Sequence, residues 1–334
     1  MLTSKRAILK LAPFLAAAVM LGSAGPASAQ NPAADYPSRP IQIIVPFSAG
    51  GVSDVLVRAV AKKLSEDMGQ PIVINNMPGA NTQIAAMAGA KADPDGYTLL
   101  MASDPAMSIN PWLYKQLRYN PQDDFVPITP LVTFSQILVT TPSVPAKTLK
   151  EFVAYAKGNP GKMNYGSFGV GSQPHLLTEE FNRLAGVKAV HIPYKGVAPA
   201  VVDMLQGQIQ YMLASVATPL GHIRSGKLVA IAIAGPHRSD LLPEVPTFAE
   251  AGFGEFQSVG WFGMFAPKGT PKPIVDKLAA KITAIVRSPE FKKEHLQANG
   301  LDAAGGTPEE FAAFLRDDRA KWKAIVENSG VKLE

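Results

Sequence analysis

Residues 41–54 read IQIIVPFSAGGVSD, and this stretch contains a strand, a glycine loop and the start of a helix. The β-branched run at 41–45 predicts a strand that Pro46 ends, because proline cannot continue a sheet's hydrogen-bond ladder. Apolar residues at helical spacing then follow through residues 52–68. Further alternating segments come next: a strand at 72–74, a helix at 82–91 and a strand at 98–102. This order predicts a parallel sheet with helices on its faces.

The alternation is interrupted twice by extended apolar segments, first near residues 130–140 and again near 255–265. Between these two crossings, a second series of strands and helices predicts another α/β lobe. We therefore expect an α/β fold of two lobes joined by two crossing strands. Residues 30–135 together with 256–334 would form one lobe, and residues 136–255 an inserted second lobe. The alternative is two lobes in series; the insertion predicts a cleft between lobes, where small ligands usually bind.

The N-terminal segment has the features of a cleavable signal peptide, predicted here as residues 1–29. A basic start (Lys5, Arg6, Lys10) precedes an apolar run at 11–21 and a small-residue cleavage site at 27–29. The apolar run is shorter than the ~20 residues that a membrane span needs. We therefore expect a mature protein that begins near Gln30 and resides in the periplasm of a Gram-negative type of cell, not embedded in a membrane.

Composition excludes several classes of function. The chain has 334 residues, enough for two ordinary domains, and a formal net charge of +5, most of which comes from the predicted signal peptide. The small charge that remains on the mature chain therefore does not indicate nucleic-acid binding. With no cysteine, thiol nucleophiles, thiolate metal sites and disulfides are all ruled out. The five histidines show no metal-ligand spacing, so we expect neither a metal nor a cofactor.

Three loops have glycines between a predicted strand and a predicted helix, and the first is the loop at 46–51. A helix start of this kind offers free N–H groups and the positive end of the helix dipole to an anion. Gly50 and Gly51 permit a close approach of the backbone to a ligand. Ser53 or Asp54 can cap the first turn, and Asp54 is included in the predicted site.

The second loop, residues 166–172, has three glycines and two serines and precedes the sequence Gln-Pro-His. Ser172 suits an N-cap and Pro174 the first helical turn. The loop fails as a dinucleotide fingerprint, because Pro174 stands where glycine or alanine is required. It also fails as a nucleophile elbow, because Tyr165 stands where glycine is required. Carboxylate binding survives these eliminations. Of the five histidines, only His175 is a candidate for the cleft, because it lies on the helix that follows this loop.

The third loop, residues 193–199, leads into a helix that carries Asp203 about one turn from its start. This carboxylate either faces the cleft or is an ordinary solvated acid, and the sequence favours neither reading.

Motifs along nearly the whole mature chain resemble the Bug family, the periplasmic receptors of tripartite tricarboxylate transporters. Each motif is weak alone, and their order along the chain makes the set specific. They are residues 36–41, 46–54, 76–81, 95–99, 166–175, 193–196, 203–208 and 226–228.

The resemblance implies a two-lobed periplasmic binding protein fold, a type II-like Venus flytrap with two crossing strands. It also implies a carboxylate held by the first two glycine loops, largely through backbone N–H groups and hydroxyls. It also implies delivery of the ligand to inner-membrane transporter subunits. Carried over by position, it points to the following residues: Phe47, Ala49, Gly50, Gly51, Ser167, Gly169, Gly171 and Ser172, with Asp203 from the second lobe.

One departure from the family concerns Phe168, where members often have a small polar residue. We expect Phe47 and Phe168 to favour a carboxylate with an apolar or aromatic body, although dicarboxylates and other acids stay open. The predicted function is therefore a periplasmic binding protein for a small organic carboxylate, not an enzyme. The alternatives are a ligand-sensing receptor of a two-component system and, more remotely, a periplasmic hydrolase, for which Ser172 and His175 lack an orienting acid.

Overall fold

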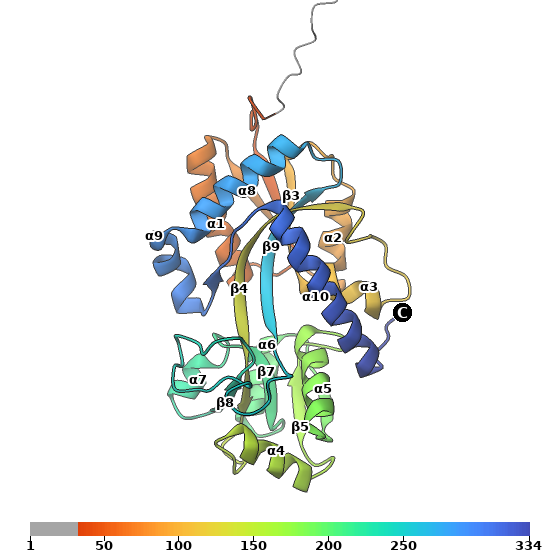
Figure 1. The fold of residues 1–334 in the computed structure, drawn as a ribbon, viewed down its shortest axis with the longest axis vertical. Helices are drawn as coiled ribbons and strands as arrows, with labels where there is room; N and C mark the ends of the chain where they lie inside the picture. Colours follow the sequence, from red (N-terminus) through yellow and green to blue (C-terminus); the bar gives the residue numbers. More distant parts are fainter. Residues whose placement is uncertain (1–32) are drawn as a thin grey trace, which may run out of the picture.

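A computed structural model describes residues 33–334, so the predicted signal peptide, residues 1–29, lies outside the described residues. Figure 1 shows two α/β lobes, one above the other, with an extended strand running from one to the other. Within residues 33–334, no helix combines the length and the apolar composition that a membrane crossing needs.

The first lobe begins with the predicted alternation of strands and helices. Strand β1 pairs in parallel with β2 on one side and with β3 on the other. The elements are β1 (Ile41–Val45), α1 (Val52–Met68), β2 (Ile72–Asn76), η1 (Ala80–Thr82), α2 (Gln83–Ala90), β3 (Thr98–Ser103), η2 (Pro105–Ile109) and α3 (Asn110–Leu113).

The second lobe repeats this architecture. Strand β5 pairs in parallel with β6 and β7. The elements are α4 (Leu149–Gly158), β5 (Asn164–Ser167), α5 (Gln173–Ala185), β6 (Val190–Pro193), α6 (Val197–Leu205), β7 (Tyr211–Ser215), α7 (Leu220–Arg224) and β8 (Val229–Ile233).

The chain then returns to the first lobe and ends there with a long helix. Strand β9 lies between β3 and β4, antiparallel to both. The returning elements are β9 (Val259–Pro267), α8 (Lys272–Arg287), α9 (Pro289–Phe291), η3 (Lys292–Leu296), η4 (Gln297–Asn299), β10 (Asp302–Ala303) and α10 (Pro308–Ser329).

Strand β4 (Phe125–Thr140) joins the lobes because it belongs to both. Up to Ser135 it pairs with β9, and from Gln136 onward it pairs with β7 and β8. Two lobes in series would not place β9 beside β4, so the chain crosses twice, as the sequence predicts. The lobe boundaries at 135/136 and 255/256 stay predictions.

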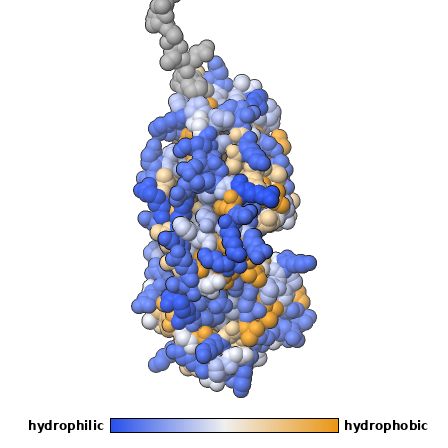
Figure 2. Space-filling view, turned by 90° about the vertical axis from the view of Figure 1, so that its right-hand side faces the viewer, coloured by the Kyte–Doolittle hydropathy of each residue, from blue (hydrophilic) through white to orange (hydrophobic). Residues whose placement is uncertain are grey.

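The strand directions place the carboxyl ends of both parallel sheets opposite one another. Strand β3 is antiparallel to β9, which is antiparallel to β4, so β1, β2 and β3 run toward the second lobe. Strands β5, β6 and β7 run the other way, because β7 is antiparallel to β4. The loops that follow β1, β2, β5 and β6 therefore face the region between the lobes, and Figure 2 shows the surface hollowed there at the right of the view.

Helix α10 spans both lobes, which the sequence does not predict. Phe311 and Leu315 in its first half pack into an apolar cluster of the first lobe, with Trp261. Trp322 and Val326 in its second half pack into the main cluster of the second lobe. The helix is thus a third connection between lobes, running beside α5 (Figure 1).

Candidate functional site

The first glycine loop, between β1 and α1, is fixed from beneath by Asp54. This side chain is 2% exposed, and its Oδ2 accepts hydrogen bonds from the Gly50 N–H and the Arg58 Nε, both at 2.9 Å. Asn76 donates to Asp54 Oδ1 and to the Phe47 carbonyl, also at 2.9 Å. The hydrogen bond from Arg58 is the main reason that the pKa of Asp54 is lowered to about 2.

Asp54 therefore shapes the loop instead of capping the helix, which corrects the expectation that it or Ser53 caps the first turn. Gly51 is the N-cap residue and has no side-chain cap. The carboxylate reaches back to the Gly50 N–H because Gly50 adopts a left-handed conformation, with φ of +85°. Ala49, Gly50 and Gly51 are left exposed on the outer side of the loop.

Phe47 belongs to an aromatic cluster that the crossing strands complete. Its ring lies edge-on to Phe262 of β9, with ring centroids 5.8 Å apart. Phe262 in turn contacts Phe134 of β4 at 5.1 Å. All three rings are half-buried. The sequence does not predict that Phe134 and Phe262 belong to this cluster, because only the pairing of β4 with β9 brings them to Phe47.

The second glycine loop follows β5 and precedes α5. The buried Ser167 hydroxyl donates to the Gly169 carbonyl at 3.0 Å, and the Ser172 hydroxyl donates to the same carbonyl at 2.7 Å. Ser172 occupies the N-cap position, as predicted, but its side chain makes no cap hydrogen bond. Both serine hydroxyls therefore bond within the loop, and neither caps the backbone N–H groups in the first turn of α5.

Three further residues of this loop and of α5 belong to the predicted site, namely Phe168, Gly171 and His175. Phe168 is half-buried against the apolar cluster of β7, β8 and α6. Gly171 packs against the first lobe: a Cβ at this position would lie 2.5 Å from Leu113 Cδ2. His175 is only 5% exposed and lies behind the loop, where its Nδ1 accepts the Gly171 N–H.

The third loop carries a tyrosine–aspartate pair. Asp203 on α6 is half-buried, and its Oδ2 accepts a hydrogen bond from the Tyr194 hydroxyl at 2.8 Å. Burial, together with this carboxylate, raises the pKa of Tyr194 to about 12. Asp203 is therefore neither free in solvent nor without a partner.

Four helices that begin at the facing carboxyl edges lack a side-chain cap. They are α1 and α2 in the first lobe and α5 and α6 in the second. Away from these edges, α4 and α10 each have a complete capping box, from Thr148 and Thr307, whereas α8 also lacks a side-chain cap. The uncapped first turns present backbone donors toward the region between lobes, a feature that suits an anion.

A further loop at this edge, between β2 and α2, carries a left-handed backbone that sequence motifs do not reveal. Ala80, Asn81 and Thr82 have φ of 45°, 47° and 71°. Asn110 stabilises this conformation: its Oδ1 accepts from Asn81 Nδ2 at 2.8 Å and its Nδ2 donates to the Asn81 carbonyl at 2.9 Å. Such conformations are costly for non-glycine residues and are concentrated at functional sites.

A buried polar bridge also connects the lobes beneath these loops. Gln173 at the start of α5 donates to Asp104 of the first lobe and accepts from Gln136 Nε2 of β4 at 2.8 Å. Burial, with Asp318 nearby, raises the pKa of Asp104 well above its usual range. The sequence does not predict this bridge, because its three side chains are far apart along the chain.

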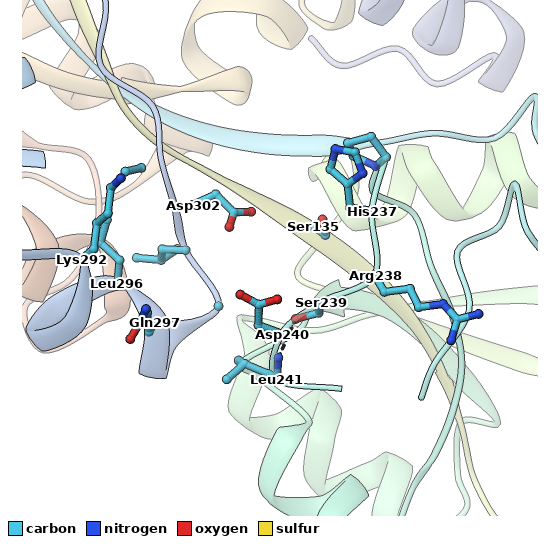
Figure 3. A pocket seen from close by; sticks show the side chains of 14 residues that line it. Ser135, His237, Arg238, Ser239, Asp240, Leu241, Lys292, Leu296, Gln297 and Asp302 are labelled. Carbon is cyan, nitrogen blue, oxygen red and sulfur yellow. Dashed lines mark hydrogen bonds between the residues drawn. The ribbon is translucent and has the colours of Figure 1, made fainter. Parts of the chain in front are cut away.

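A cavity of about 440 Å³ lies elsewhere between the lobes (Figure 3). It is lined by Ser135, by the loop after β8 and by residues of the segment from η3 to β10. None of the predicted site residues lines it. In Figure 3, Asp240 and Asp302 extend toward one another from the two lobes. Burial and the neighbouring Asp240 raise the pKa of Asp302.

The geometry does not pair Ser172 with His175 as a nucleophile and a base. The Ser172 hydroxyl donates to a backbone carbonyl, and the His175 Nδ1 accepts a backbone N–H, so the two side chains are engaged separately. Among residues 33–334, no group of three or more histidine and carboxylate side chains is arranged to hold a metal ion.

Two α/β lobes, a double crossing and a cleft bordered by helix starts define a two-lobed solute-binding protein of the Venus-flytrap type. Residues 56–331 match the family model described as "Tripartite tricarboxylate transporter family receptor". The chain belongs to this family of periplasmic solute-binding receptors, as its motifs predict.

Relatives of similar length support this assignment. Protein BugT of Bordetella pertussis is 38% identical over 314 residues, which cover 94% of this chain and 95% of that protein. The solved structure of R. palustris Rpa4515 with adipate is 31% identical, with a TM-score of 0.81 and coverage of 89% of this chain and 99% of that one. MatC from Rhodopseudomonas palustris with bound malate is 32% identical, with a TM-score of 0.76 and coverage of 87% and 100%.

Proposed function

We propose that this chain captures a small organic carboxylate in the cleft between its lobes. The observation that carries the proposal is the set of uncapped helix starts, α1 and α2 facing α5 and α6 across the cleft. Their backbone donors and helix dipoles favour an anion over a neutral or cationic ligand. The glycine loops that carry most of the predicted ligand residues lead into α1 and α5, and Asp203 lies on α6.

The solved relatives support the class of ligand. Their names record adipate and malate, and both compounds are dicarboxylates. A dicarboxylate suits a cleft with helix starts on both sides, because one carboxylate can bind to each lobe. Binding to both lobes would favour the closed state through contacts that the open state lacks.

The aromatic cluster suggests what the rest of the ligand is like. Phe47, Phe134 and Phe262 are half-buried beside the first loop, and Phe168 is half-buried beside the second. We infer that the ligand has an apolar or aromatic body that these rings contact. Phe168→Ser should weaken an aromatic acid more than malate, and equal effects on both would contradict this inference. Phe314→Ser, at a 38% exposed ring on α10, is the matched control.

Delivery to a transporter completes the proposal. We expect a cleavable signal peptide, a mature protein in the periplasm, and transfer of the ligand to inner-membrane subunits of a tripartite tricarboxylate transporter, without catalysis. Deleting the gene should abolish uptake of the radiolabelled ligand. If the deletion leaves uptake normal but abolishes the transcriptional response to the ligand, the protein is instead the sensor of a two-component system.

Thermal unfolding of residues 30–334 against a panel of organic acids tests the binding step. A ligand that binds only the native state raises the melting temperature by mass action. Unfolding and refolding the protein first removes any co-purified ligand. If no aliphatic or aromatic acid then changes the melting temperature while the refolded protein is native by circular dichroism, carboxylate capture is refuted.

A further inference from the structure

The backbone of the second glycine loop is held from behind by a buried histidine. The Gly171 N–H donates to His175 Nδ1 at 3.1 Å, and the imidazole is 5% exposed. A backbone N–H can only donate, so Nδ1 must be unprotonated. The hydrogen bond therefore requires a neutral His175 with its proton on Nε2.

A second histidine holds the other end of the same loop. His191 on β6 lies 2.6 Å, through its Nε2, from the Ser167 hydroxyl, which donates to the Gly169 carbonyl. The two imidazole rings are stacked, with centroids 3.8 Å apart and planes at 16°. One stacked pair thus contacts both the start and the end of the loop.

The surroundings of the pair favour its neutral state. Tyr165 stacks on His191 at 4.9 Å, and the Tyr165 hydroxyl is bonded to Glu179 of α5, so this acid faces the phenol. Tyr211 on β7, which packs beside Tyr165, donates to an amide. The pKa of each histidine is lowered to about 4, for His175 by burial and for His191 by burial together with the neighbouring imidazole.

We propose that His175 and His191 are positioning residues of the carboxylate site: as neutral imidazoles they hold the backbone of residues 168–171 in its binding conformation. The Gly169 and Gly171 N–H groups are used within this arrangement, because they donate to Ser167 Oγ and to His175 Nδ1. The inference rests on the proposed function, because the loop matters only if it binds the ligand. It gives His175 a role behind the loop, through Gly171, in place of direct contact with the ligand. Protonation of His175 removes the acceptor nitrogen, so the loop loses its binding conformation and the protein loses affinity for the carboxylate.

Two substitutions at one position separate this role from simple packing. In His175→Asn the amide oxygen can replace Nδ1 as the acceptor, whereas His175→Leu fills the space without an acceptor. We expect His175→Asn to bind adipate or malate within about threefold of the wild type at pH 7. His175→Leu should lose about fivefold to a hundredfold, because a buried N–H without a partner is costly. His222→Asn on α7 is the matched control and should bind like the wild type.

Isothermal titration calorimetry measures these affinities, with the melting temperature of each variant as the check on folding. Equal affinities for the wild type and a folded His175→Leu would overturn the proposal. An equal loss of affinity in His175→Asn and His175→Leu would also overturn it, because the loss would then come from altered packing and not from the missing acceptor.

A readout without ligand distinguishes failure of this proposal from failure of the proposed function. The amide resonance of Gly171 is followed by NMR from pH 7 to pH 3.5. It should shift with a midpoint near the pKa of about 4 in the wild type and in His222→Asn, but not in His175→Asn. If the Gly171 resonance of the wild type does not shift between pH 7 and pH 3.5, the inference is overturned. If the resonance titrates as expected but no acid binds, the proposed function is what fails.

Discussion

Replacing Asp54 by asparagine tests how the first glycine loop is maintained. The substitution keeps the size of the side chain and removes its charge. In the native protein this carboxylate accepts from the Gly50 N–H, Arg58 and Asn76. An amide nitrogen in place of one oxygen would face one of these donors, so at least one hydrogen bond is lost.

The size and pH dependence of the effect follow from the pKa of Asp54. Its decrease from 3.8 to about 2 corresponds to about 2–3 kcal/mol at ~1.4 kcal/mol per unit. The guanidinium of Arg58 is 50% exposed, and solvent screening reduces this to about 1–2 kcal/mol. Because the folded pKa is the lower one, this stability is fully present above pH 3.8 and is lost as the pH falls through 2.

Urea denaturation of wild type and Asp54→Asn between pH 7 and pH 2.5 measures the difference directly. The variant should be less stable by about 1–2 kcal/mol at pH 7, and the gap should narrow below pH 4. Its affinity for the carboxylate should also fall, because the first glycine loop loses a hydrogen bond that fixes its backbone. Glu66→Gln, an exposed acid on the same helix, is the control. A gap at pH 7 that is absent, or that stays constant down to pH 2.5, would refute the reasoning.

Two further substitutions test the connection between the lobes. Gly260→Ala should destabilise the protein by about 1–3 kcal/mol, because its Cβ would lie 2.3 Å from the Phe134 ring. Gly254→Ala, whose Cβ would meet nothing within 4 Å, should be nearly neutral by the same urea denaturation. Gln173→Leu should lower the free energy of unfolding by about 1–3 kcal/mol, because it leaves the buried Asp104 without its amide donor. Unchanged urea midpoints for Gly260→Ala or Gln173→Leu would contradict the packing or the bridge, respectively.

Local patterns along the chain were sufficient to predict the fold. The β-branched run at 41–45, the glycines after it and the helical spacing through residue 68 correspond to β1, a loop and α1. The two extended segments predict the crossings, because a strand that leaves one sheet and joins another needs no helix at that point. The double role of α10 could not be predicted in this way. Its apolar residues indicate a buried face, but not which lobe buries each half.

The sequence by itself determined the family, the two lobes and the three glycine loops, since these depend on residue type and local spacing. Only the tertiary structure decided which way the polar side chains of those loops are directed. Asp54 and His175 stabilise their loops from behind, while Asn110 and Gln173 connect segments that are distant along the chain. The physical reason is that a buried polar group needs a partner, and the partner is fixed by the packing of the lobes.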